Sequence, residues 1–187
     1  MMTGSKPDGA SPQNAWENGT PLPTSSVLMR VATGYLARYA ASSRRVRQVL
    51  ERRIQRRCRA EGLEAPDNGA LTAALDDVVA RLERLGLLDD RAFAAGRVRA
   101  LQRKGLPEQR IRMALRGEGL DAPEAEDDNE VVDDAAQARR YAARKRLGPF
   151  RRGDRPSFRD KDLRSLLRAG FSFRIAVETV DAEPEPI

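Results

Sequence analysis

The chain has 187 residues, of which 33% are charged and 5% aromatic, and its net charge is +6. A single cysteine, Cys58, and the absence of histidine exclude an internal disulfide, a zinc site of Cys and His within one chain, and histidine-based acid–base catalysis. We find no apolar run of about 18 residues and no signal-peptide layout, so we expect a cytoplasmic protein without a membrane partner. The basic balance favours an anionic partner such as nucleic acid, although solubility alone also explains a modest excess of arginine.

The sequence predicts two tails and a series of helices. Residues 1–26 are rich in Pro, Gly and Ser, which predicts a disordered tail, and residues 182–187 form a short C-terminal tail. No segment alternates like a strand, so the fold class is all-α. Apolar spacing and capping residues place helices at about 27–39, 44–60, 71–85, 90–104, 107 to either 117 or 119, 133–147, 159–169 and 172–180. We expect at most a short helix at 123–128, within the acidic stretch 121–134, and a basic loop over 148–156.

A short pattern of an apolar residue, Arg, two further residues and Leu occurs three times, at 46–50, 111–115 and 163–167. Each copy is followed by a glycine and a large apolar residue, at Gly62, Gly119 and Gly170. This self-similarity predicts units of about three helices at 27–86, 87–130 and 131–181. The alternative is that such patterns arise by chance in an arginine-rich helical protein. The predicted core includes Leu75, Val78, Leu82, Phe93, Leu115 and Leu167.

The helix predicted over 44–60 carries its charge on one side. At 100° per residue, its apolar residues up to Ile54 share one face, and four arginines share the opposite face. Arg53 and Arg57 project on the apolar side, so we expect the core contact to fade after Ile54. The guanidinium fork suits phosphate, which favours anion binding over an ordinary solvated face. The four arginines of this ridge are Arg45, Arg52, Arg56 and Arg59.

Basic residues elsewhere extend the candidate binding surface. Charge spread in this way suits contacts to a nucleic-acid backbone better than recognition of individual bases. The aromatic residues lie at positions expected in the core, where they cannot stack on bases. Sequence-specific recognition is therefore not supported. The further candidates are Arg99, Arg103, Lys104, Arg110, Arg112, Arg140, Arg144 and Lys145.

No motif predicts catalysis, and we assign no catalytic residue, metal site or cofactor. A Gly-rich phosphate loop, a nucleophile elbow and a metal-ligand cluster are all missing from the sequence. Asp89 and Asp90 have the chemistry to hold a divalent metal, but they also suit an ordinary helix start. Cys58 lies among arginines in the sequence, yet the sequence offers it no base, which favours a passive thiol.

A series of short motifs runs through the chain in a fixed order. They are Tyr35-Leu36-Ala37-Arg38, Ser43 with Val46-Arg47 and Leu50, Leu82 to Ala94, Arg103-Lys104-Gly105, Ile111-Arg112 with Leu115, Gly119-Leu120, and Leu166 to Ser172. In these motifs the chain resembles the RecX family, the regulators of the RecA recombinase. The resemblance covers about residues 30–180, and its most specific part is the segment from Gly86 to Ala94. The family often has a second glycine where Pro107 stands here, and this chain adds an insertion between Leu50 and Gly62.

The resemblance implies three tandem three-helix repeats in an elongated, curved array. It also implies a non-enzymatic, monomeric protein of DNA repair, recombination and the SOS response. Such a protein binds RecA filaments, restrains their ATP hydrolysis and strand exchange, and binds single- and double-stranded DNA weakly and without sequence specificity. The alternative is a nucleoid-type DNA-binding protein that acts without RecA. An enzyme ranks third and requires a metal-dependent activity of Asp89 and Asp90.

Overall fold

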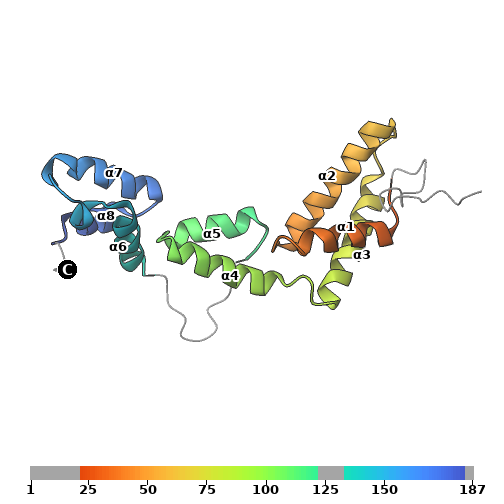
Figure 1. Cartoon of the computed structure of the whole chain (residues 1–187), viewed down its shortest axis with the longest axis horizontal. Helices are drawn as coiled ribbons and strands as arrows, with labels where there is room; N and C mark the ends of the chain where they lie inside the picture. Colours follow the sequence, from red (N-terminus) through yellow and green to blue (C-terminus); the bar gives the residue numbers. More distant parts are fainter. Residues whose placement is uncertain (1–21, 122–132, 184–187) are drawn as a thin grey trace, which may run out of the picture. The chain divides into compact units, whose positions relative to one another are not determined.

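The computed structural model describes residues 22–121 and 133–183, and their regular structure is helical throughout (Figure 1). The predicted all-α class is therefore confirmed. Residues 1–21 of the tail predicted at 1–26, residues 184–187 of the tail predicted at 182–187, and the short helix predicted at 123–128 lie outside the described residues. The tail prediction is wrong for Ser25 and Ser26, which form the start of α1. The helices are α1 (Ser25–Leu36), α2 (Ser43–Glu61), α3 (Asn68–Arg84), α4 (Asp90–Arg103), α5 (Glu108–Gly117), α6 (Asp134–Lys145), α7 (Arg159–Ala169) and α8 (Phe173–Asp181). Two 3₁₀ turns, η2 (Gly148–Phe150) and η3 (Pro156–Phe158), flank the basic segment that was predicted to be entirely loop.

The chain divides into two compact units, with the boundary between Asp89 and Asp90. The first unit packs α1, α2 and α3 around one apolar core, which includes the predicted Leu75, Val78 and Leu82. Helix α2 begins as predicted, because the Ser42 hydroxyl accepts a hydrogen bond from the Arg45 N–H at 3.3 Å. The prediction that core contact fades after Ile54 is wrong, since Cys58, one turn further along the same face, is also buried in this core.

The second unit contains two apolar clusters. Helices α4 and α5 enclose one of them around Leu101 and Leu115, with Phe93 packed against it as a half-buried residue. Helices α6, α7 and α8 enclose the other around Leu166 and Phe171. The acidic side chain of Asp134, at the start of α6, accepts a hydrogen bond from the Glu108 N–H at 2.9 Å. It therefore caps α5, which begins after a proline that offers no side-chain cap. The division into three repeats remains a prediction.

The three glycines of the repeated pattern all end their helices in the left-handed conformation. Gly62, Gly119 and Gly170 have φ values of 65°, 72° and 100°. In each case the following apolar residue donates its N–H to a carbonyl five residues earlier, which is the hydrogen bond of a Schellman motif. The donor–acceptor pairs are Leu63–Cys58 at 2.9 Å, Leu120–Leu115 at 3.0 Å and Phe171–Leu166 at 3.2 Å.

The third copy of the pattern is rotated relative to the prediction. Leu167 was predicted to be a core residue, but it is 36% exposed, and Leu166 is buried in its place. The physical reason is Asp162, which is 1% exposed and lies one turn before Leu166 on the inner face of α7. Its carboxylate accepts hydrogen bonds from the Gly148 N–H at 2.9 Å and from the Arg151 guanidinium at 2.5 and 3.0 Å. These bonds hold α7 with Asp162 inward, so Leu167 faces outward.

Candidate nucleic-acid and partner interface

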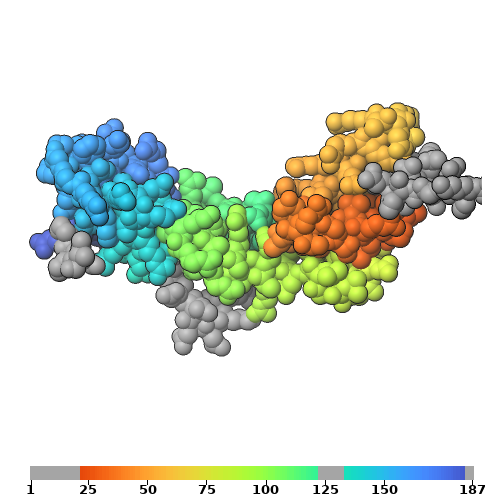
Figure 2. All heavy atoms as spheres, viewed as in Figure 1, coloured from red at the N-terminus to blue at the C-terminus, as the bar shows by residue number. Residues whose placement is uncertain are grey.

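The predicted arginine ridge lies on the outer face of α2. Arg45, Arg52, Arg56 and Arg59 are all exposed, whereas residues at every fourth position from Val46 to Cys58 fill the core on the opposite side. The atoms of α2, coloured orange to yellow, form an uncovered surface of the first unit (Figure 2). The amphipathic spacing of the sequence therefore places these four guanidinium groups together.

The charge of the ridge is not neutralised within the described part of the chain. None of the four guanidinium groups lies within 4.0 Å of a carboxylate among residues 22–121 and 133–183; Arg45 instead donates to the Gln48 amide oxygen at 3.5 Å, and Arg56 to the Arg52 carbonyl at 3.4 Å. The ion pairs of α2 involve arginines outside the ridge. Arg47 pairs with Asp76, and Arg57 pairs with Glu61 at 2.9 Å. With respect to residues 22–121 and 133–183, the four guanidinium groups are therefore open to an external anion.

A second set of predicted basic residues comes from α4 and α6. Arg99, Arg103, Lys104, Arg140 and Lys145 are all exposed. Gly105, two residues after the end of α4, packs against the backbone of α6, where an added Cβ would lie 2.6 Å from the Tyr141 nitrogen. This approach brings the basic end of α4 against the middle of α6. The exposed Arg144 lies 5.7 Å from the centre of the Tyr141 ring, which places one more cation on α6.

Two further predicted binding residues have partners inside the protein. Arg110 donates to the Arg168 carbonyl at the end of α7 at 2.9 Å, so it joins α5 to α7. Arg112 pairs with Glu108 on its own helix, with an N–O distance of 2.5 Å. Both side chains remain exposed, but Arg110 has a structural role and the charge of Arg112 is balanced locally.

Comparison with known proteins places the chain in a family. It is 38% identical over 163 residues to the regulatory protein RecX of Myxococcus xanthus, a match that covers 84% of this chain and 86% of that protein. The chain belongs to the RecX family. A second relative, the regulatory protein RecX of Prosthecochloris aestuarii, is 33% identical over 117 residues, which cover 61% of this chain and 75% of that protein. No family model matches the chain, and no solved structure matches it.

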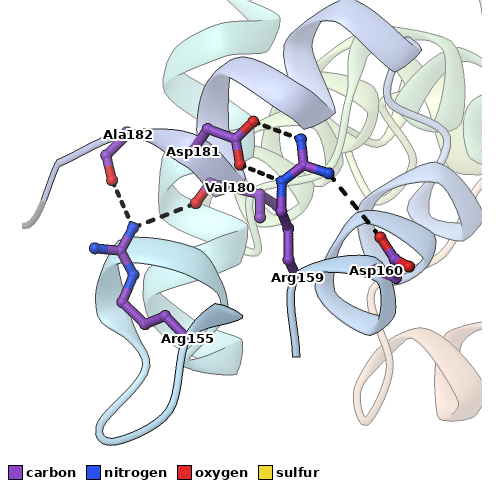
Figure 3. A network of polar contacts seen from close by, with 6 residues as sticks. All are labelled: Arg155, Arg159, Asp160, Val180, Asp181 and Ala182. Carbon is purple, nitrogen blue, oxygen red and sulfur yellow. Dashed lines mark hydrogen bonds and ion pairs between the residues drawn. The ribbon is translucent and has the colours of Figure 1, made fainter. Parts of the chain in front are cut away.

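In this RecX-family chain, the arginines of the basic segment after α6 serve the fold. Arg155 donates to the Ala182 carbonyl at 2.8 Å and to the Val180 carbonyl at 3.4 Å, so it caps the end of α8 (Figure 3). Arg159 forms a two-bond pair with Asp181 at 2.6 and 2.7 Å (Figure 3). Hydrogen bonding to Arg159 lowers the pKa of the Asp181 carboxyl below its ordinary value. A run of basic residues in the sequence gives no signal that separates such structural arginines from binding ones.

The buried carboxylate of Asp162 was also missed by sequence reasoning. Burial alone would raise the pKa of Asp162, but hydrogen bonds from Arg151 and from the Gly148 N–H outweigh it and hold the pKa below its ordinary value. The residue therefore stays charged inside the RecX fold. Its partner Arg151 also lies 4.4 Å from the centre of the Phe158 ring, which packs the pair against η3.

Metal-ligand clusters and membrane-spanning helices are both absent from the described residues. Within 22–121 and 133–183, no three acidic or cysteine side chains gather in a way that could hold a metal ion. In the same residues, no helix combines the length and the apolar character needed to cross a membrane. Asp90, the second residue of the acidic pair considered as a metal site, is the first residue of α4.

Proposed function

We propose that this RecX-family protein regulates the RecA recombinase by binding RecA nucleoprotein filaments and slowing their ATP hydrolysis and strand exchange. The observation that carries the proposal is the exposed, unneutralised ridge of Arg45, Arg52, Arg56 and Arg59 in a chain of this family. A RecA filament presents both protein and DNA phosphate, so a regulator with a cationic helix face can contact both at once.

The geometry of the ridge fits contacts to a phosphate backbone. Residues 45 to 59 span 14 helical steps, or about 21 Å at 1.5 Å per residue. Guanidinium groups spaced along such a line neutralise several phosphates of one strand without reading bases. Binding through these contacts falls as salt rises, because each neutralised phosphate releases counterions.

Inhibition follows if one molecule contacts more than one RecA protomer. The three predicted repeats supply several weak contact surfaces on one chain, and linking weak contacts raises the overall affinity. A bridged filament resists subunit addition and the rearrangements that accompany ATP turnover. The protein should therefore act below one-to-one stoichiometry with RecA.

The test is RecA-dependent ATP hydrolysis on limiting single-stranded DNA, titrated with the full chain. We expect turnover to fall at substoichiometric amounts. Unchanged turnover at equimolar protein would contradict the proposal. A nucleoid-type protein that acts without RecA is the alternative, and it predicts equal affinity for naked DNA and for filaments, together with loss of the effect when DNA is in excess.

The ridge itself is tested by charge reversal with a matched control. The variant Arg52→Glu with Arg56→Glu should weaken binding to filaments and to single-stranded DNA and leave the helix content by circular dichroism unchanged. The control is Arg38→Glu with Arg84→Glu, which makes the same charge change at two exposed arginines. Like Arg56, each of them donates to a backbone carbonyl of the preceding turn. Equal effects of the two variants would show that net charge matters and the ridge does not.

A further inference from the structure

Three aromatic side chains are exposed, contrary to the expectation that the aromatic residues lie in the core. Tyr39 is 56% exposed, Phe158 is 37% exposed and Phe173 is 64% exposed. An exposed ring matters in a chain with a cationic helix face, because proteins bind single-stranded nucleic acid through basic surfaces that also offer aromatic rings to its bases. The three rings differ in what holds them.

Phe158 and Phe173 are poorly placed to receive a base. The Arg151 guanidinium lies over the Phe158 ring, 4.4 Å from its centre, and its ion pair with the buried Asp162 fixes it there. Phe173 is the first residue of α8, and its ring pairs with no other ring in the described part of the chain. A base would have to displace a cation at Phe158, or meet an unsupported ring at Phe173.

Tyr39 is the outer member of a pair of tyrosine rings. Its ring centre lies 5.2 Å from that of Tyr35, with 36° between the planes, and paired aromatic rings are typically about 4.5–7 Å apart. The Tyr39 N–H donates to the Tyr35 carbonyl at 3.0 Å, which carries the chain one turn past Tyr35 and sets the rings side by side. Tyr35 is half-buried and packs against the core of the first unit. The exposed ring is therefore held in place by a ring that the core anchors.

The Tyr39 ring has a free side for a further ring. Tyr35 occupies one side of it, so much of the exposed area lies on the other side. A base placed there extends the stack of two rings to three. Because the ring is already ordered by its partner, binding the base costs little conformational entropy in the protein.

The connection between α1 and α2 places the pair close to the arginine ridge (Figure 1). Two residues separate Tyr39 from Ser42, whose hydroxyl accepts a hydrogen bond from the Arg45 N–H at 3.3 Å. Consecutive Cα atoms are about 3.8 Å apart, so the Cα atoms of Tyr39 and Ser42 lie within about 11 Å of each other. Both Ala41 and Ser42 are buried, which fixes the connection on the core. Arg45 is the first arginine of the ridge, so the tyrosine pair lies near the end of the ridge where α2 begins.

The ridge and the tyrosine pair suit different parts of a nucleotide. Guanidinium groups bind the phosphates, and an uncharged ring stacks on a base. The bases of a duplex are already stacked on one another, so only a single strand can use the ring. Arg38 is not part of this site, because it donates to the Gly34 carbonyl at 3.1 Å and follows a different line along α1 from the two tyrosines.

We propose that the pair of Tyr35 and Tyr39 is a base-stacking site for single-stranded nucleic acid, and that it makes the α2 ridge favour single strands over duplex. This inference rests on the proposed function, which assigns phosphate contacts to the ridge. It adds a contact to a base, through the ring of Tyr39 and without its hydroxyl group.

The first test compares the full chain with its Tyr39→Leu variant in binding to oligo-dT, to an abasic strand of the same length, and to duplex DNA. The abasic strand keeps the phosphates and lacks the bases. We expect Tyr39→Leu to weaken binding to oligo-dT by about tenfold, which is the size of one base–aromatic stack. Binding to the abasic strand and to duplex should stay at the level of the parent, and Tyr39→Phe should bind oligo-dT like the parent.

The matched control is Phe173→Leu, which also removes an exposed ring, but one without a paired ring. It should leave the affinity for oligo-dT unchanged. The proposal is overturned if Tyr39→Leu binds oligo-dT like the parent, if the control loses as much affinity, or if Tyr39→Leu loses equally on the abasic strand. A loss in Tyr39→Phe would overturn stacking as the cause.

A salt titration separates stacking from charge. Tyr39→Leu should lower the affinity for oligo-dT without changing how steeply it falls with salt, because no phosphate contact is lost, whereas Arg52→Glu with Arg56→Glu should make the fall less steep. A less steep fall in Tyr39→Leu would show that the ridge itself is disturbed, and would overturn the assignment. These measurements contain no RecA, so failure of the proposed function is distinguishable: the parent would bind oligo-dT and leave RecA turnover unchanged.

Discussion

Removing the buried carboxylate of Asp162 should selectively destabilise the helices α6, α7 and α8. The substitution Asp162→Ala leaves the Gly148 N–H and the Arg151 guanidinium without their partner. Removing one partner of a buried ion pair lowers the free energy of unfolding by about 3–5 kcal/mol. The Arg151 side chain is 21% exposed and can recover some hydration, so we expect the lower end, about 3 kcal/mol.

Amide hydrogen exchange followed by mass spectrometry measures this loss helix by helix. A loss of about 3 kcal/mol accelerates exchange through local opening by on the order of a hundredfold. The effect should appear in α6, α7 and α8 and spare the helices of the first unit. The control is Asp160→Ala on the same helix, where the side chain is exposed and its nearest arginine nitrogen is 4.0 Å away.

The same substitution should change the pH dependence of stability. The pKa of Asp162 is lowered in the folded protein, so its contribution is complete above the unfolded value of about 3.9 and is lost as the pH falls through the folded pKa. The parent should therefore lose protection in α7 below about pH 4, and Asp162→Ala should lose less. Equal exchange in the Asp162 and Asp160 variants at neutral pH would refute the role given to this pair.

Three more substitutions test the packing and the helix ends. Leu82→Ala removes a fully buried side chain from the first core and should cost about 2–5 kcal/mol in urea unfolding. Gly105→Ala should destabilise more than Gly86→Ala in thermal unfolding: both glycines have a positive φ, but only the added Cβ at 105 meets the Tyr141 backbone at 2.6 Å. Arg146→Gly should raise the thermal midpoint, because Arg146 ends α6 at φ 56°, where glycine is favoured by about 1 kcal/mol.

Helix ends were largely predictable because they depend on local chemistry. The hydroxyl groups of Ser42 and Ser172 cap α2 and α8 by accepting a hydrogen bond from the backbone N–H three residues later. Gly86 adopts a left-handed conformation after α3. The end of α6 at Arg146 could not be predicted in this way, because the sequence does not show when a residue other than glycine ends a helix in the left-handed conformation. The structure also ends α1 at Leu36, three residues before the predicted end.

Long-range pairing was not predictable from the same patterns. The periodicity of α7 predicted that Leu167 lies in the core. The helix is instead rotated about its axis, because Asp162 faces inward to pair with Arg151, eleven residues away in sequence. The ridge on α2 was predictable because helical periodicity alone sets the face of each arginine. The partner of Arg110 is 58 residues away, so sequence reasoning counted this structural arginine among the binding residues.

The three apolar clusters bear on how the chain folds. Their buried residues fall in consecutive stretches, from Leu28 to Leu88, from Ala94 to Leu120 and from Ala138 to Val180. Each core can therefore close without residues that come later in the sequence. Helical proteins with such local contacts have low contact order and fold rapidly. The first core can form on the ribosome while the arginines of the later helices are still being synthesised.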